Sequence, residues 1–309
     1  MSNLLQGIVA ATVLPFRDDG APDLDSYSRF VDHLVIEGVG GLAINADSGE
    51  GMSLWPAERV DVGKAAVEAA AGRVPIVAGV MASFTDLACR NAEEAAGYGA
   101  DALLVFPNAH LRGRPLDPEV PLRYLRRIHE ASGLPIVAFQ LQDDLGGVVY
   151  EPETLEAIVT SPFITAIKES TFDAYKFRRT MSLVRSVAPD VSFLSGNDNF
   201  IHESFVLGAD GALIGAGSIA TGLQVQMFDA VRRRDYEAAA GIAEKIEPLM
   251  VAVFGAPIRD YRARTKEGLV ALGLFENASV REPLLDCPAE EADAVRQALV
   301  VAGLLESGE

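Results

Sequence analysis

Cysteine and histidine are scarce in this chain of 309 residues, which contains two cysteines and four histidines. The pair Cys89 and Cys287 cannot build a disulfide framework and provides no ligand set for a metal cluster. Asp143 and Asp144 are adjacent and could supply oxygen ligands to a divalent cation, but no third ligand is recognisable in the sequence. We therefore expect no metal site.

Basic residues and long apolar runs are also lacking. The 26 lysines and arginines are outnumbered by 44 aspartates and glutamates, so the formal net charge is −18. Such a chain repels nucleic-acid phosphates and anionic lipid, and no apolar run approaches the roughly 18 residues of a membrane span. Residues 1–16 have no basic leader, so no signal peptide is expected. The composition predicts a soluble, cytoplasmic protein without nucleic-acid or membrane partners.

The sequence does contain a regular alternation of short apolar runs and amphipathic segments. The runs are rich in Val, Ile, Leu and Ala without polar alternation, as expected of parallel strands buried on both faces. They occupy residues 7–16, 40–45, 74–80, 101–107, 134–141, 164–170, 191–196 and 210–217. Helical segments lie between them, and several end at a glycine. Eight such units in about 220 residues predict an α/β protein with a (β/α)8 TIM barrel.

An open doubly wound sheet is the alternative, but it would need a Gly-rich fingerprint after the first strand, where residues 13–20 offer none. Beyond the eighth run the pattern is helical only, at about 222–233, 235–254, 258–273 and 289–305. No Pro- or Ser-rich linker separates this region from the barrel. We expect a barrel over residues 1–233 and a C-terminal helical segment over 234–309 packed on it. Trp55 is expected to lie in the core.

Lysine is the most informative residue type because the chain has only five: Lys64, Lys168, Lys176, Lys245 and Lys266. Active-site groups of a (β/α)8 barrel lie at the carboxyl ends of the strands, and Lys168 follows the apolar run 164–167. The other four fall on helical segments and are expected to be solvated. Desolvation lowers a lysine's pKa, which favours the free amine that forms an imine. The alternative is a structural lysine paired with Glu169 or Asp198.

Four segments resemble signatures of the dihydrodipicolinate synthase/N-acetylneuraminate lyase family. Residues 45–50 resemble the family's Gly-Thr-Thr-Gly-Glu turn, and residues 167–170 resemble its Schiff-base lysine strand. Residues 208–211 and 280–284 are similar to two further signatures. The resemblance covers nearly the whole chain in the right order. It implies a class I aldolase that forms a covalent imine on Lys168 and needs no other cofactor.

The chain also departs from this family. The family's fifth strand usually ends in a Tyr-Asn pair, whose tyrosine shuttles protons, but Phe139 and Gln140 stand here. Asp144 occupies the position of an arginine that dihydrodipicolinate synthases usually have, and Asp47 replaces the first hydroxyl of the turn. These changes predict fewer proton donors and more negative charge around the lysine. They argue against a true dihydrodipicolinate synthase.

Together, the resemblance and the departures define a predicted site. The predicted catalytic positions are Lys168, Phe139 (at the place of the family tyrosine), His110 and Asp144. The predicted substrate-binding residues are Asp47, Ser48, Gly49, Gln140 and Gly215, the last leaving room for a ligand. The group that replaces the tyrosine in proton transfer stays open among His110, Asp47, Asp144, Tyr150 and a bound water.

The predicted function is a lysine-dependent lyase for a small 2-oxo acid or sugar-derived acid, acting by aldol cleavage, condensation or dehydration. A sugar-acid dehydratase of the same family and a non-catalytic oxo-acid-binding barrel are the alternatives. The resemblance further implies a homo-oligomer, a dimer of dimers. In many members an aromatic residue of the neighbouring subunit completes the proton relay. Asn108 and Ala109 occupy its usual position, so no such contribution is expected here.

Overall fold

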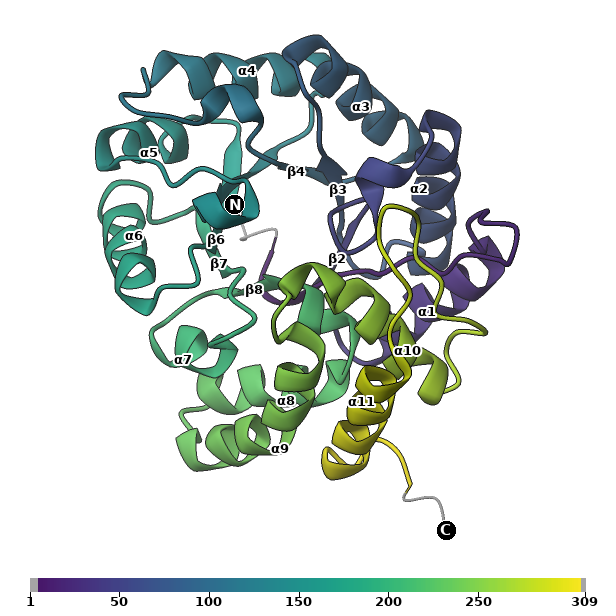
Figure 1. The fold of residues 1–309 in the computed structure, drawn as a ribbon. Coiled ribbons are helices and arrows are strands. Elements are labelled where there is room, and N and C mark those ends of the chain that lie inside the picture. The colour runs from purple at the N-terminus through teal and green to yellow at the C-terminus, as the bar shows by residue number, and fades with distance from the viewer. Residues whose placement is uncertain (1–4, 307–309) are drawn as a thin grey trace.

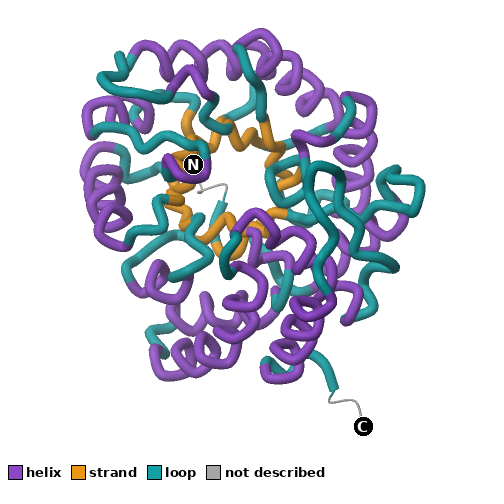
Figure 2. The backbone as a smooth tube through the Cα atoms, in the orientation of Figure 1, coloured by secondary structure: helices purple, strands orange, loops and turns teal. Residues whose placement is uncertain are grey.

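Eight parallel strands form a closed barrel surrounded by helices in the computed structural model, which describes residues 5–306 (Figures 1 and 2). Neighbouring strands pair in chain order, and β1 closes the barrel against β8. The strands are β1 (Gly7–Ala11), β2 (Gly41–Ile44), β3 (Ile76–Val80), β4 (Ala102–Val105), β5 (Ile136–Leu141), β6 (Ile164–Ser170), β7 (Ser192–Ser195) and β8 (Gly211–Ile214). The predicted TIM barrel is confirmed, and each strand lies within its predicted apolar run.

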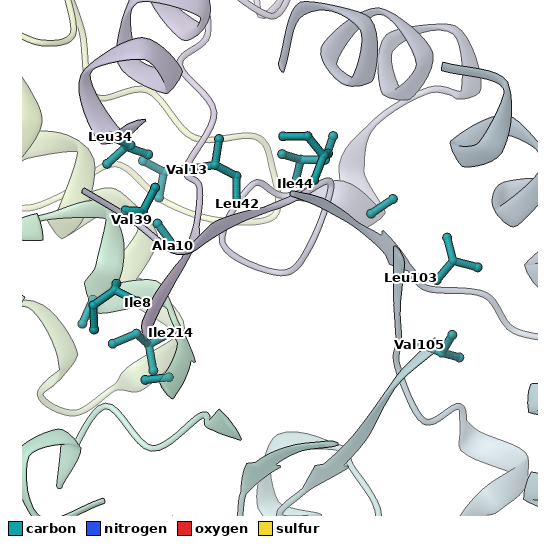
Figure 3. Packing of buried hydrophobic residues seen from close by; sticks show 14 of the residues in the cluster. Ile8, Ala10, Val13, Leu34, Val39, Leu42, Ile44, Leu103, Val105 and Ile214 are labelled. Carbon is teal, nitrogen blue, oxygen red and sulfur yellow. The ribbon is translucent and has the colours of Figure 1, made fainter. Parts of the chain in front are cut away.

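Both faces of the barrel wall are buried. Side chains such as Ile8, Leu42 and Leu103 point outward and pack under the helices (Figure 3). Their neighbours, such as Val9 and Leu104, belong to a second cluster that fills the barrel interior. Burial of both faces explains why the apolar runs lack the alternation of half-exposed strands.

Helices α1 to α8 follow the strands in turn and cover the outside of the barrel. Asp23 accepts a hydrogen bond from the Ser26 amide (3.1 Å) at the start of α1, and Asp173 caps α6 in the same way. The helices are α1 (Leu24–Ile36), α2 (Pro56–Ala70), α3 (Thr85–Tyr98), α4 (Glu119–Ser132), α5 (Pro152–Val159), α6 (Ala174–Val187), α7 (Ile201–Val206) and α8 (Thr221–Arg232). Within residues 5–306, no helix combines the length and apolarity that crossing a membrane requires.

Three further helices follow the barrel: α9 (Tyr236–Phe254), α10 (Tyr261–Ala271) and α11 (Ala289–Val301). Figure 1 shows them beside α8 and α1, on one side of the barrel. Their apolar residues, including Leu249, Leu269 and Leu299, belong to the same core cluster as the outward face of the strands. The segment after residue 233 therefore shares its core with the barrel, and α10 begins beside the barrel mouth.

Two expectations about single residues are wrong. Lys266 is not solvated: its side chain is 0% exposed and lies between α10 and the turn after β2, where its ammonium forms an ion pair with Glu50 at 2.6 Å. Trp55 is not in the core, because 73% of it is exposed. It directly precedes α2 at the mouth end of the barrel.

Candidate active site

A cavity of about 770 Å³ opens at the carboxyl ends of the strands. Every strand, or the loop that follows it, contributes to its wall, as the geometry of a (β/α)8 barrel requires. These contributions include Ala11, Ala46, Met81, Phe106, Phe139, Lys168, Gly196 and Gly215. The loop before α10 and the start of that helix cover part of the opening with Arg259, Tyr261 and Arg262. The cavity is therefore built by the barrel and its C-terminal helices together.

Lys168 projects from β6 into this cavity. It shares the inward face of the strand with Ala166, whereas Glu169 points the other way and accepts a hydrogen bond from Asn197 Nδ2 at 2.9 Å. The Lys168 ammonium lies 4.5 Å from the centroid of the Phe139 ring. Burial lowers the pKa of Lys168 from 10.5 to about 8, against an opposing attraction from Asp198 and Asp47. The lysine is therefore poised to lose its proton near neutral pH.

Asp198 is the second titratable group in the cavity wall next to Lys168. It follows β7, and its Oδ1 accepts a hydrogen bond from the Ala216 amide at 3.0 Å. Burial raises the pKa of Asp198 to about 6. Gly196 precedes it, and a Cβ at that position would come within 2.5 Å of the Lys168 Cε. Glycine is thus required there for the lysine side chain to enter the cavity.

The turn after β2 is joined to α10 by hydrogen bonds. Ser48 Oγ and Tyr261 Oη lie 3.0 Å apart, and Tyr261 Oη donates to Asp47 Oδ2 at 3.1 Å. Arg262 forms an ion pair with the Asp47 carboxylate and donates from Nε to the Asp47 carbonyl at 2.7 Å. The expected excess of negative charge around Lys168 is therefore wrong at this position, because Arg262 neutralises Asp47.

Five of the predicted site residues line the cavity: Lys168, Phe139, Asp47, Ser48 and Gly215. A Cβ on Gly215 would lie 3.2 Å from the Tyr261 ring and 3.3 Å from Ser48 Oγ, so this glycine does leave space beside both groups. Gly49 supports the turn from behind, since a Cβ there would lie 3.0 Å from the Thr12 carbonyl oxygen. The inward placement of Phe139 follows from the strand alternation that also places Val137 inside the barrel.

The other predicted positions lie outside the cavity. Gln140 faces the helix layer, where its amide donates to Thr180 Oγ1 at 3.1 Å and accepts from the Tyr150 amide at 3.2 Å. The prediction that Gln140 binds substrate is therefore wrong, because Gln140 lies on the opposite face of β5 from Phe139. His110 and Asp144 lie in short 3-10 turns with their side chains exposed, and neither lines the cavity. Asp144 therefore adds no negative charge to the cavity wall.

The basic character of the cavity and the contribution of α10 were not predicted from the sequence. The cationic side chains in the wall are Arg59, Arg112, Lys168, Arg259 and Arg262, against the carboxylates of Asp47 and Asp198. An excess of positive charge in a chain of net charge −18 favours an anionic ligand in this cavity. Tyr261 and Arg262 stand in an ordinary helical pattern, and no local signal shows that this helix starts at the barrel mouth.

The sequence of this chain is similar to those of known proteins over almost its whole length. The family model "Dihydrodipicolinate synthetase family" matches residues 4–302. The chain belongs to this family. It is 29% identical over 301 residues to a probable 2-dehydro-3-deoxy-D-pentonate aldolase of Escherichia coli, covering 97% of this chain and 98% of the relative. It is 30% identical to 4-hydroxy-tetrahydrodipicolinate synthase 2 of Streptomyces coelicolor, covering 96% and 95% of the two chains.

The solved structures agree with this membership. The dihydrodipicolinate synthase of Acinetobacter baumannii, solved in complex with pyruvate, is 26% identical and superimposes with a TM-score of 0.85 over 98% of this chain and 100% of that one. Membership of the dihydrodipicolinate synthetase family makes the chain an aldolase-type lyase, as the sequence predicts. The relatives named as aldolase and as synthase are similar to the chain to the same degree, so identity alone does not select between their reactions.

Within this family fold, the cavity combines a nucleophile with groups that bind an anion. Lys168 can add to a carbonyl carbon, and the hydroxyl of Ser48 and the arginines of the wall can hold a carboxylate. Among residues 5–306, no three His, Cys, Asp or Glu side chains converge in an arrangement that could hold a metal ion.

Proposed function

We propose that this chain is a lysine-dependent lyase that binds a small 2-oxo acid, or a sugar-derived 2-oxo acid, as an imine on Lys168. The observation that carries the proposal is the partly buried lysine at the end of β6, whose pKa falls to about 8 in the cavity. The free amine adds to the C2 carbonyl, and loss of water gives a protonated imine. This cation withdraws electrons from C3, so that a proton can leave C3 or the C3–C4 bond can break.

The charges and size of the cavity support an acid as the substrate. Ser48, in the turn after β2, and the arginines of the wall offer donors to a carboxylate. The volume of about 770 Å³ lies within the range of sites for drug-sized ligands and exceeds the needs of a three-carbon acid. The remaining space would hold an aldehyde partner or the rest of a sugar acid.

Phe139 argues for a reaction other than that of a true dihydrodipicolinate synthase. Its ring packs edge-on against Phe106 at 4.9 Å and carries no exchangeable proton at the place of the family tyrosine. Aldol cleavage is the reaction we favour, because the E. coli relative is named as an aldolase. Dehydration of a sugar acid would pass through the same imine and enamine and is the second candidate. A barrel that binds oxo acids without turnover is the third.

A product assay separates these three. The protein is incubated with a panel of 2-dehydro-3-deoxy sugar acids, and the products are identified by mass spectrometry. We expect pyruvate and an aldehyde from at least one member of the panel. Loss of water with all carbons retained would identify a dehydratase instead. Thermal stabilisation by the acids without any product would contradict turnover and favour a binding protein. The Lys168→Ala variant is the matched control and should form no product.

We also propose that the chain assembles as a homo-oligomer, a dimer of dimers, with the active site built within one subunit. The support for the second part is that Asn108 and Ala109 line the cavity, at the position where many family members receive an aromatic residue from a neighbouring subunit.

A further inference from the structure

Tyr261 is the feature of the cavity that the proposed reaction leaves unexplained. It is the first residue of α10 and belongs to the segment that follows the barrel, yet its side chain lines the same cavity as Lys168. Its hydroxyl lies between two other polar groups of the site, at 3.0 Å from Ser48 Oγ and 3.1 Å from Asp47 Oδ2. A phenol is thus present in the cavity although strand five has lost its own.

The direction of these hydrogen bonds follows from the number of protons available. A carboxylate only accepts hydrogen bonds, so the single hydroxyl proton of Tyr261 goes to Asp47. Before a ligand engages it, Ser48 then donates its own proton to the Tyr261 oxygen. Burial and the charge of Asp47 raise the pKa of Tyr261, so it remains a neutral phenol. Half of the Asp47 side chain is exposed, which connects the chain of hydrogen bonds to solvent.

The surroundings hold Tyr261 in this position. Its ring stacks on Phe254 with centroids 5.3 Å apart and planes inclined by 24°. The neighbouring Arg262 binds Asp47, so both ends of the Tyr261–Asp47 hydrogen bond are fixed by separate contacts. The absence of a side chain at Gly215 leaves space beside the Tyr261 ring and Ser48 Oγ. These contacts orient a proton donor toward the cavity before any substrate arrives.

We propose that Tyr261, backed by Asp47, is the catalytic residue that moves the proton at C3 of the substrate held on Lys168; this inference rests on the proposed imine chemistry. In the forward step the C3–H proton passes to Tyr261 Oη while the Tyr261 proton passes to Asp47 Oδ2. The C3–H electron pair becomes the C2=C3 bond of an enamine, and the electron pair of the C=N bond moves to the lysine nitrogen. The reverse step returns the proton to C3, and Asp47 exchanges its proton with water.

The other candidates for this role are less well placed. His110, Asp144 and Tyr150 do not line the cavity, and Phe139 has no proton to give. Asp198 is the remaining titratable group beside Lys168, but its Oδ1 is engaged by the Ala216 amide. Asp198 is therefore the competitor that the experiment must separate from Tyr261.

The test measures imine formation and proton transfer separately, with pyruvate as the probe. Borohydride trapping followed by mass spectrometry reports the imine on Lys168. Exchange of the pyruvate methyl protons for deuterium, followed by NMR in D2O, reports deprotonation at C3. For Tyr261→Phe we expect trapping within about twofold of the unsubstituted protein and exchange slower by about 10²- to 10⁴-fold, the usual contribution of a positioned acid or base. Tyr27→Phe is the matched control, since it removes a buried hydroxyl bonded to Thr12 at 2.9 Å outside the cavity.

Two further variants test the proposed partner of Tyr261 and its competitor. Asp47→Asn keeps an oxygen acceptor but removes the base at the end of the relay, so it should also lose exchange while retaining trapping. Asp198→Asn removes a charge that raises the pKa of Lys168, so any change it causes should appear equally in trapping and in exchange. Trapping with undiminished exchange in Tyr261→Phe, or loss of exchange only in Asp198→Asn, would overturn the role of Tyr261. Equal loss of trapping and exchange in Tyr261→Phe would show a merely structural role. Failure of the unsubstituted protein to trap pyruvate or any other oxo acid would instead overturn the proposed function.

Discussion

At the scale of single residues, the environment of Lys168 sets the chemistry. A fall in its pKa from 10.5 to about 8 raises the fraction of free amine at pH 7 by roughly 300-fold. Burial is the main cause, since the ammonium loses water when it enters the cavity. The Phe139 ring lies 4.5 Å from the ammonium and carries no hydroxyl. We therefore expect the proton donor to lie elsewhere in the cavity while Lys168 keeps its role.

Some residues of the cavity wall could be predicted from local sequence patterns, and others could not. Lys168 could be placed in the cavity because the barrel rule puts the carboxyl ends of all strands at one mouth, and Ser48 and Gly215 could be placed there from the family resemblance. Gln140 was misassigned, although strand alternation turns it to the opposite face of β5 from Phe139. Tyr261 could not be predicted, because its role depends on where α10 begins in space, more than 210 residues after Asp47 along the chain.

At the scale of elements, a buried charge cluster ties the C-terminal segment to the turn after β2. Lys266 of α10 donates to Glu50 Oε1 at 2.6 Å and to the Ser279 carbonyl at 2.7 Å. Glu50 also accepts a hydrogen bond from the Arg281 amide at 2.8 Å, and the Arg281 guanidinium pairs with Glu58 at the start of α2. The same cluster therefore fixes the turn that carries Asp47 and Ser48 and the helix that carries Tyr261.

We predict that Lys266→Met lowers the free energy of unfolding by about 3–5 kcal/mol. The substitution leaves the Glu50 carboxylate buried without its cation, which is the costly way to break an internal ion pair. Urea unfolding monitored by circular dichroism measures the change. Lys176→Met, on the exposed face of α6, is the matched control and should shift the value by no more than about 0.5 kcal/mol. An equal effect of both substitutions would show that the cluster contributes no net stability.

The elements themselves were largely predictable from the sequence. The eight strands and the C-terminal helices lie where apolar runs and helical periodicity indicate, because both signals depend on burial within each element. Lys266 was misassigned because a helix whose whole circumference is buried shows no polar face to recognise its lysine by. Trp55 was misassigned because a large apolar side chain is usually buried, whereas Trp55 is exposed.

At the scale of the whole molecule, exposed apolar side chains support assembly with further copies. Met52 and Trp55 are 79% and 73% exposed, and Phe84 is 54% exposed after the neighbouring strand β3. Exposed apolar groups gathered at one end of a barrel are typical of an association surface. All three follow the carboxyl ends of β2 and β3, so they lie at the mouth end of the barrel.

We predict a particle of at least twice 32.9 kDa by light scattering at micromolar protein concentration. Trp55→Glu should shift the mass toward that of one chain, because it places a charge in the buried contact. Tyr236→Glu, on an exposed residue of α9, is the matched control and should leave the mass unchanged. A mass of one chain for the unsubstituted protein would contradict the assembly.

Borohydride trapping mapped by peptide mass spectrometry shows directly whether this cavity forms an imine on Lys168. With pyruvate or a productive sugar acid, we expect one adduct per chain, on Lys168 alone. The rate of trapping should rise about tenfold per pH unit below pH 8 and level off above it, because only the free amine reacts and its pKa is about 8. Absence of any adduct on Lys168 in the folded protein would show that the lysine forms no imine, and a rate that keeps rising to pH 10 would show that its pKa is not lowered.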